Sequence, residues 1–482
     1  MQDLIKELQE LETLAKYLEP STVQMKAWTD QVNSYGLNFL EGLEEGGAYK
    51  QYDGQKLDFI DFDEEGSSME QILNKIKETV DKFGINPASG GHLGYIPGGG
   101  LYSSALGDYL AAVSNRYAGI FYANPGAVKM ENDLIRWTAE VMGYPSNAGG
   151  NLSSGGSIAN LIAVTTARDR LGIEGSKVEK AVVYMTEQVH HCVHKALRIA
   201  GLGKTVWRSI PMDADFRMDV LALETALEKD KAAGLIPFMI FASAGTTDVG
   251  AVDPLDKIAD LSEQYGSWFH VDGAYGAAFN LVDSMKPLFK GIERSDSLVI
   301  DPHKGLFLSY GLGIVLVRDV KAMAESHYYN ANYMQDAKAD SAMHWSPADL
   351  SPELTKHYRG MRMWLSFKLF GLRAFRASIE EKHLLTKYFW NRMKEEGFEL
   401  GPDPALSVTV YRFVPPKGDT NVFNQNLMKA VLTDGFNFIS STTIERNIWL
   451  RLAVLSFRTH KDRIDHLIHT LVQAKDELLS KQ

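Results

Sequence analysis

Short runs of strand-forming residues alternate with helical patterns through the middle of the chain, between about residues 129 and 319. Apolar positions within these runs are continuous rather than alternating, which indicates strands covered on both faces. The pattern therefore predicts a mostly parallel α/β sheet, in which ligands bind at the carboxyl ends of the strands. The runs are AVVYM (181–185), FMIFAS (238–243), SWFHVD (267–272), SLVID (297–301) and GIVLV (313–317).

Helical patterns flank this region on both sides. Leucines and charges at helical spacing from Leu4 to Leu18 and from Met25 to Leu43 predict two amphipathic helices, too narrow to form a core alone. Helical patterns from Arg359 to Lys394 lead to strand-like runs such as SVTVYRF and NIWLRLAV, which indicate a smaller α+β unit. We predict three units: an N-terminal helical segment (1–85), a large α/β domain (86–370) and a small C-terminal α+β domain (371–482).

Composition and charge narrow the class of protein. The 482 residues carry a formal charge of -11 and no long basic run, which argues against a nucleic acid or an anionic membrane as partner. No apolar stretch approaches the roughly 20 residues of a membrane span, and the N-terminus lacks the layout of a signal peptide. Cys192 is the only cysteine, so no intrachain disulfide can form. These features predict a cytoplasmic protein.

Two motifs suggest a site for an anionic ligand and a cation. In SSGGSIANLIAV, residues 153–164, glycines and a serine precede a helical pattern, so backbone N–H groups can cradle a phosphate, although a simple turn has the same appearance. In HVDGAYG, Asp272 ends a strand expected to be buried. A carboxylate there requires a cation or hydrogen-bond donors, unless it caps the next helix.

Two further motifs bring histidines and a lysine. EQVHHCVHKA holds His190, His191, Cys192 and His194, but adjacent residues diverge in direction and zinc-site spacings are absent, so we predict no metal. A histidine here is instead expected to stack on a flat ligand or to make hydrogen bonds that stabilise the fold. Lys304 follows the strand run SLVID; a lysine ending a buried strand loses charge through desolvation and becomes a nucleophile, unless it snorkels to the surface.

An amine, a buried carboxylate, a stacking imidazole and a phosphate cradle together match one ligand. Pyridoxal 5'-phosphate has an aldehyde, a pyridine nitrogen, a flat ring and a phosphate. The sequence therefore predicts that Lys304 forms the covalent link to this cofactor.

The same motifs resemble a known family. DPHKGLF, HVDGAYG, EQVHH, SSGGSIANL and AGTTDVGAVDPL are similar, in this order, to the group II pyridoxal-phosphate decarboxylases of aromatic amino acids, glutamate and histidine. The resemblance implies the type I fold of pyridoxal-phosphate enzymes, which is like that of aspartate aminotransferase, with a large, mostly parallel seven-stranded sheet and a small C-terminal α+β domain. It also implies a homodimer in which the N-terminal helices pack on the partner.

The resemblance assigns cofactor roles to individual residues. Lys304 corresponds to the Schiff-base lysine, Asp272 to the aspartate that keeps the pyridine nitrogen protonated, and His190 to the imidazole stacked on the ring. Asp301 stands where many members have asparagine, and its charge would repel a phosphate. Further cofactor contacts are expected from Gly155, Gly156, Ser157, Thr246, Ala274 and His303.

The resemblance also indicates the reaction. Tyr333 falls where the family has the tyrosine of its mobile active-site loop, with Tyr328 and Tyr329 as competitors; it would protonate the substrate carbon after CO2 leaves. Gly98 to Gly100 would leave room for a large substrate side chain. The expected walls of the substrate pocket are Tyr95, Ile96, Pro97, His191 and Phe121.

We therefore predict decarboxylation of an L-amino acid, preferably tryptophan, tyrosine, phenylalanine or dihydroxyphenylalanine, to the amine. Glutamate, histidine or diaminobutyrate as substrate, oxidative decarboxylation to an aldehyde, and a catalytically silent cofactor-binding protein are the alternatives.

Overall fold

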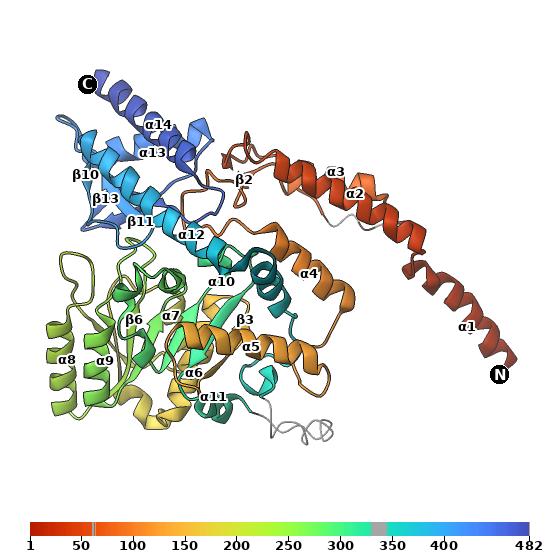
Figure 1. The fold of residues 1–482 in the computed structure, drawn as a ribbon, viewed down its shortest axis with the longest axis horizontal. Helices are drawn as coiled ribbons and strands as arrows, with labels where there is room; N and C mark the ends of the chain where they lie inside the picture. Colours follow the sequence, from red (N-terminus) through yellow and green to blue (C-terminus); the bar gives the residue numbers. More distant parts are fainter. Residues whose placement is uncertain (60–61, 63, 329–344, 482) are drawn as a thin grey trace.

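A seven-stranded sheet forms the centre of the molecule (Figure 1). The computed structural model describes residues 1–59, 62, 64–328 and 345–481. The strand order is β3-β9-β8-β7-β6-β4-β5. The strands are β3 (Gly149–Ser153), β4 (Ala181–Met185), β5 (Val206–Ser209), β6 (Ile236–Ser243), β7 (Trp268–Asp272), β8 (Ser297–Ile300) and β9 (Gly313–Val317).

The sheet is mostly parallel, as predicted. Strand β9 runs antiparallel to both of its neighbours, β3 and β8, while every other pairing in the sheet is parallel. Each of the five predicted runs forms a strand, and each ends within one residue of its predicted end. The direction of β9 was not visible in its sequence, because a strand buried on both faces has the same apolar run in either direction.

Helices cover both faces of this sheet (Figure 1). Successive residues of β6 alternate between two cores: Ile240 and Ala242 pack in one, Met239 and Phe241 in the other. All four side chains are at most 2% exposed, which explains the continuous apolar run. The helices of this region are α4 (Tyr102–Ser114), α5 (Pro125–Val141), α6 (Gly156–Arg170), α7 (Cys192–Ile199), α8 (Val220–Ala232), α9 (Leu255–Tyr265), α10 (Pro302–Gly305) and α11 (Val320–His327).

A second, antiparallel sheet lies in the C-terminal part of the chain, with the order β10-β11-β13-β12. Helix α12 (Gly360–Glu395) leads into it and is interrupted at Gly371, whose φ of 67° is outside the helical range. The division of the chain into 1–85, 86–370 and 371–482 stays a prediction. The other elements of this part are β10 (Glu399–Leu400), β11 (Val408–Arg412), α13 (Thr420–Asp434), β12 (Ser440–Ile444), β13 (Asn447–Ala453) and α14 (Lys461–Ser480).

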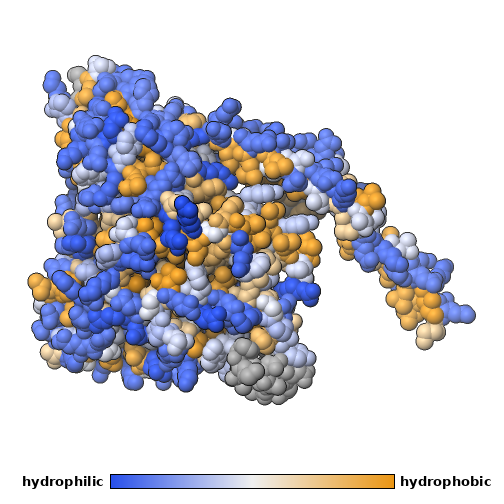
Figure 2. All heavy atoms as spheres, in the orientation of Figure 1, coloured by the Kyte–Doolittle hydropathy of each residue, from blue (hydrophilic) through white to orange (hydrophobic). Residues whose placement is uncertain are grey.

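The N-terminal helices project from the body as an arm (Figure 1). Leu4, Leu8 and Leu11 on α1 are 53%, 56% and 56% exposed, and Figure 2 shows apolar residues along the arm and on the nearby face around α4. No described helix is long and apolar enough to cross a bilayer. The elements of the arm are α1 (Gln2–Ala15), α2 (Thr22–Glu41), β1 (Tyr49–Lys50), α3 (Met69–Thr79) and β2 (Gly84–Ile85).

A buried histidine joins the end of this arm to the C-terminal unit. His92 is 3% exposed, and its ring centroid lies 5.7 Å from that of Phe438. Burial lowers the pKa of His92 to about 4, and the nearby carbonyl of Pro87 opposes the shift only in part. His92 is therefore neutral in the folded protein at neutral pH.

A His92→Leu variant is expected to resist acid better than the wild type. Between pH 6.5 and about 4 the unfolded chain protonates His92 while the folded chain does not, so the wild-type free energy of unfolding decreases as the pH falls. The variant should lose about 2 kcal/mol less between pH 7 and 4.5. Denaturant unfolding at both pH values measures this difference. The exposed His469→Leu is the matched control; equal losses in wild type and His92→Leu would contradict the expectation.

Candidate active site

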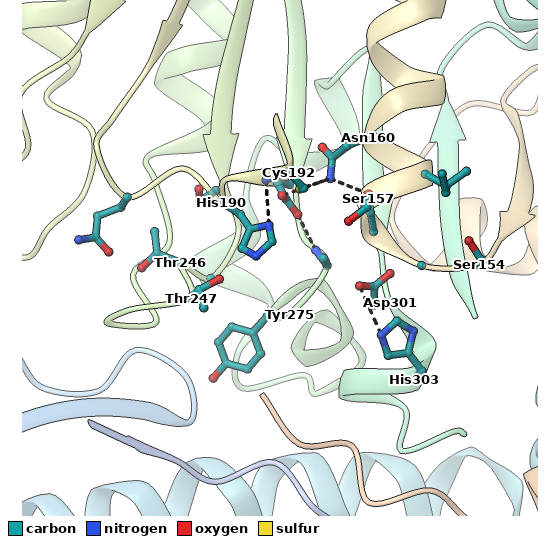
Figure 3. Close-up of a pocket in the computed structure, with 18 residues that line it drawn as sticks. Ser154, Ser157, Asn160, His190, Cys192, Thr246, Thr247, Tyr275, Asp301 and His303 are labelled. Carbon is teal, nitrogen blue, oxygen red and sulfur yellow. Dashed lines mark hydrogen bonds and ion pairs between the residues drawn. The ribbon is translucent and has the colours of Figure 1, made fainter. Parts of the chain in front are cut away.

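A cavity of about 280 Å³ opens at the carboxyl ends of the parallel strands (Figure 3). Its walls come from the start of α6 and from the loops that follow β4, β6, β7 and β8. Figure 3 shows Ser157 and Asn160 of α6 on one side and Thr246 and Thr247 on the other. This is the edge of the sheet where ligands were expected.

The start of α6 forms an open backbone surface beside Asp301 and His303. Gly155 has φ 148°, and a Cβ atom there would lie 3.3 Å from Cε1 of His303. A Cβ atom at Gly156 would lie 2.9 Å from Oδ2 of Asp301, so a side chain would have to displace that carboxylate. Ser157 adds a hydroxyl at the cavity wall. Free N–H groups at a helix start and a hydroxyl together suit a phosphate.

Lys304 lies on the four-residue helix α10, after β8 has ended at Ile300. Its Nζ is 3.0 Å from Oδ2 of Asp301, and its side chain is 25% exposed. Burial alone would lower the pKa of Lys304, but the carboxylates of Asp301 and Asp272 outweigh it and raise the pKa. The predicted loss of charge is therefore wrong for the protein by itself, because the sequence did not reveal that Asp301 acts as counter-ion.

Asp301 is 2% exposed and lies beneath the start of α6. Besides Lys304, its carboxylate faces Nε2 of His303 at 3.7 Å. The other oxygen, Oδ1, has no hydrogen-bond partner among the described residues. The ammonium of Lys304 offsets the charge of this carboxylate and so moderates the repulsion expected between it and a phosphate.

Asp272 is the last residue of β7, and each of its carboxylate oxygens accepts a hydrogen bond. Oδ1 accepts from the backbone N–H of Ala274 at 3.1 Å, and Oδ2 accepts from Nδ2 of Asn160 at 3.4 Å. These hydrogen bonds fix the orientation of the carboxylate at the cavity wall. It can therefore serve as partner for a protonated ring nitrogen.

His190 presents a neutral ring at the cavity wall. Its Nδ1 accepts from the backbone N–H of Cys192 at 3.4 Å, and burial lowers its pKa. The proton of the neutral ring then lies on Nε2. The centroid of the His191 ring is 4.1 Å from that of His190.

The predicted cofactor contacts come together at this cavity. Thr246 is buried, and its hydroxyl accepts from the backbone N–H of Ala251 at 3.1 Å. Lys304 is placed beside the cavity by its pair with Asp301. The chemistry of this set fits pyridoxal phosphate: an anion cradle, a flat imidazole, a carboxylate and a primary amine. The residues lining the cavity include Gly155, Gly156, Ser157, His190, Thr246, Asp272, Ala274 and His303.

The predicted substrate residues do not line this cavity. Tyr95 is 58% exposed with φ 50°, and its ring packs 5.6 Å from that of Phe438. Phe121 lies in the loop before α5, where its backbone N–H donates to Ser346. The cavity's described walls include none of Tyr95, Ile96, Pro97, His191 and Phe121.

The glycines after Pro97 do not open the pocket as expected. A Cβ atom at Gly98 would overlap the carbonyl oxygen of His303, and one at Gly99 would lie 2.7 Å from Oγ of Ser456. Only at Gly100 is there nothing within 4 Å. Gly98 therefore serves a close approach of two backbones, next to Lys304, and not the size of a substrate pocket.

The expected loop acid cannot be placed. Tyr333 and its competitor Tyr329 lie outside the described residues. Tyr328 is the C-cap residue that follows α11 and is 52% exposed.

Sequence reasoning missed several residues at the cavity. Asn160 is the most informative: it is an amide one turn after Gly156 on the otherwise apolar inner face of α6, a pattern that marks a buried polar contact. Tyr275 reaches from the cavity to the C-terminal unit, where its hydroxyl lies 2.8 Å from Oγ of Ser407. The others are Ser154, Ile158, Gln188, Cys192, Ser243, Gly245 and Thr247.

The histidine-rich motif divides between two places. His190 lies at the cavity, whereas the ring of His194 packs 4.5 Å from that of Trp207. Across the part of the chain that the structure describes, no three His, Cys, Asp or Glu side chains are grouped to hold a metal ion.

Comparison with known proteins finds a matching family model and similar relatives. The family model described as the pyridoxal-dependent decarboxylase conserved domain matches residues 53–414. The aromatic-L-amino-acid decarboxylase of Bacillus atrophaeus is 31% identical over 422 residues, which cover 86% of this chain and 87% of the relative. The L-2,4-diaminobutyrate decarboxylase of Acinetobacter baumannii is 28% identical and covers 84% of this chain and 83% of its own.

The fold is shared with solved structures. The crystal structure of Oryza sativa TDC with PLP and tryptamine superposes with a TM-score of 0.90 at 22% identity, covering 95% of this chain and 99% of that chain. The predicted fold, with its large, mostly parallel sheet and smaller antiparallel unit, is thereby confirmed.

Proposed function

The chain belongs to the pyridoxal-dependent decarboxylase family, and we propose that it converts an aromatic L-amino acid to the amine and CO2. Its cofactor is pyridoxal 5'-phosphate and its reaction is the decarboxylation of an amino acid, as the family and its relatives indicate. The choice of an aromatic substrate, the role of each residue and the oligomeric state are our proposals.

We propose that different residues around the cavity bind different parts of the cofactor. We assign the phosphate to the start of α6 at Gly155 to Ser157, the ring face to His190, the ring nitrogen to Asp272 and the covalent link to Lys304. Bound pyridoxal phosphate supplies an electron-accepting ring that takes up the electron pair left when CO2 departs. Asp272 sustains this capacity because its carboxylate favours a positive charge on the ring nitrogen.

Lys304 is our candidate for the covalent link to the cofactor, and Tyr333 is our candidate for the proton donor. A free Lys304 amine would lie within reach of Asp301, whose carboxylate would stabilise it as an ammonium. Tyr333 is our candidate for the acid that delivers a proton to the substrate's α-carbon. Its role rests on its position in the sequence alone.

The observation that carries the aromatic assignment is an aromatic cluster next to the lysine-bearing turn, outside the described residues that line the cavity. Tyr95 packs on Phe438, which in turn packs on Tyr49 at 5.6 Å. This segment adjoins the lysine-bearing turn, since Gly98 lies against His303. The 31% identity with an aromatic-L-amino-acid decarboxylase supports the same choice.

Charged side chains are less well matched. No arginine is among the described residues that line the cavity, so an acidic substrate side chain lacks its usual partner there. Of the two lining acids, Asp301 already pairs with Lys304 and Asp272 is assigned to the ring nitrogen. A cationic side chain such as that of diaminobutyrate would have to compete with these pairs.

Product analysis of the cofactor-loaded protein tests the proposal. Tryptophan, tyrosine, phenylalanine and dihydroxyphenylalanine would be compared with glutamate, histidine and diaminobutyrate, measuring amine, aldehyde and CO2. We expect amine and CO2 in equal amounts, with kcat/KM at least about 10-fold higher for an aromatic substrate. Preference for a charged substrate would overturn the aromatic assignment, and aldehyde as main product would indicate the oxidative reaction. Cofactor binding without any product would indicate a silent protein.

We further propose a homodimer in which the arm packs on the partner. The apolar residues of α1 recur at helical spacing and have no cover within the described chain: Leu4, Leu8 and Leu11 are all more than half exposed. A second copy of the chain supplies a similarly apolar face around α4, where Tyr109 is 53% exposed.

A Leu8→Asp, Leu11→Asp double variant is expected to weaken this dimer by at least about 100-fold, because two leucines per subunit would no longer be buried. Sedimentation or light scattering over a range of concentrations measures the change. A matched control, Glu7→Gln with Glu10→Gln, alters exposed polar residues of the same helix. A dimer of unchanged strength in the aspartate variant would contradict the role of α1.

A further inference from the structure

A chain of buried, hydrogen-bonded side chains lies behind Asp272. Nε1 of Trp268 donates to Oγ of Ser297 at 2.8 Å, and the same Oγ lies 2.8 Å from Nδ1 of His270. Nε2 of His270 lies 2.8 Å from Oδ1 of Asn160, whose Nδ2 reaches Asp272. Ser297, His270 and Asn160 are fully buried. The chain crosses from the interior of the sheet to the cavity wall.

Both ends of this chain fix the direction of its hydrogen bonds. At the cavity end, Nδ2 of Asn160 faces the carbonyl oxygen of Gly156 at 2.9 Å and the carboxylate of Asp272, which are both acceptors. Oδ1 of Asn160 must then face His270, whose Nε2 carries the proton. At the other end, the indole N–H of Trp268 can only donate, so Oγ of Ser297 accepts it.

The middle of the chain follows from the two ends. Burial lowers the pKa of His270 to about 4, so its ring is neutral at pH 7 and carries one proton. With that proton on Nε2, Nδ1 has no hydrogen and accepts a hydrogen bond from the hydroxyl of Ser297. Every bond therefore points the same way, from Trp268 toward Asp272, and successive bonds in such a chain polarise one another.

We propose that His270 is a positioning residue that, through Asn160, holds Asp272 as an oriented carboxylate aimed at the ring nitrogen of pyridoxal phosphate. Nδ2 of Asn160 also donates a hydrogen bond to the carbonyl oxygen of Gly156 in the first turn of α6. One amide thus links the carboxylate to the helix whose start is assigned to the phosphate. The inference rests on the proposed pairing of Asp272 with the ring nitrogen.

Binding of two cofactor forms distinguishes this role from simple packing. The probes are pyridoxal phosphate and an analogue that keeps its aldehyde and phosphate but has carbon in place of the ring nitrogen. Their dissociation constants would be measured with wild type, His270→Leu and the matched variant His270→Gln, whose side-chain amide can still donate to Asn160.

His270→Leu is expected to weaken binding of pyridoxal phosphate about 10-fold and that of the analogue less than about 2-fold. His270→Gln should stay within about 3-fold of wild type for both probes. Equal weakening of both probes by His270→Leu, or of neither, would overturn the proposal. Should His270→Leu not fold, Asn160→Ala breaks the same chain and should show the same selective loss.

Binding of the two probes to the wild type tests the premise, the pairing of Asp272 with the ring nitrogen, separately from the role of His270. If wild type binds both probes equally, the pairing of Asp272 with the ring nitrogen fails, and the role of His270 with it. If wild type prefers pyridoxal phosphate and His270→Leu keeps that preference undiminished, only the role of His270 fails.

Discussion

A Lys304→Ala variant is expected to lose decarboxylase activity by at least about 10⁴-fold, the scale seen when a covalent catalyst is removed from an enzyme. Lys304 is the one amine that the described structure places against Asp301, beside the cavity. Without it the chain has no group there to form or exchange the covalent link. Steady-state kinetics and the visible absorbance of the bound cofactor measure the loss.

The matched variant is Lys304→Arg, because alanine also leaves the buried Asp301 without its cation and lowers stability. Arginine retains a positive charge beside Asp301 but cannot form the covalent link, so it should be as inactive as alanine and closer to wild type in thermal stability. Lys204→Ala, at a lysine 79% exposed, should leave activity within about 2-fold. Borohydride reduction followed by peptide mass analysis should locate the cofactor on Lys304. Attachment to another lysine would refute the assignment.

An Asp272→Asn variant is expected to be about 100-fold to 1,000-fold less active at neutral pH. Loss of an adjacent carboxylate lowers the pKa of a cationic group by about 1–3 units, so the ring nitrogen would be protonated far less often. The defect should therefore shrink as the pH falls, by up to about 10-fold for each pH unit. Measuring kcat/KM between pH 8 and 5.5 tests both parts.

The pH profile separates the charge of Asp272 from its contribution to structure. An asparagine retains the shape and can still accept the N–H of Ala274, so the fold should survive. Asp283→Asn, at an aspartate 87% exposed, is the matched control and should behave as wild type. A variant that loses activity equally at every pH would show that Asp272 matters for structure alone.

Local patterns in the sequence predicted much of the sheet. The continuous apolar runs of β4 and β6 to β9 indicate burial on both faces, and the apolar composition is a property of each strand by itself. The pairing of β3 with β9 and the antiparallel direction of β9 depend on contacts between distant segments. No single run carries that information.

The same distinction applies to the site. Lys304, Asp272 and His190 could be predicted as site residues because each stands in a motif whose residue types limit what it can do. The ion pair of Lys304 with Asp301 was missed, although they are only three positions apart, because its strength depends on burial beneath α6. The contact of Asn160 with His270 joins residues 110 apart in the chain and could only be seen in three dimensions.

The close approach at Gly98 sets a limit for anyone who wishes to redesign specificity. Any larger amino acid there would push on the peptide of His303 and so shift the turn that carries Lys304. Libraries aimed at new substrates should therefore leave this glycine unchanged and vary residues that do not support the turn of Lys304.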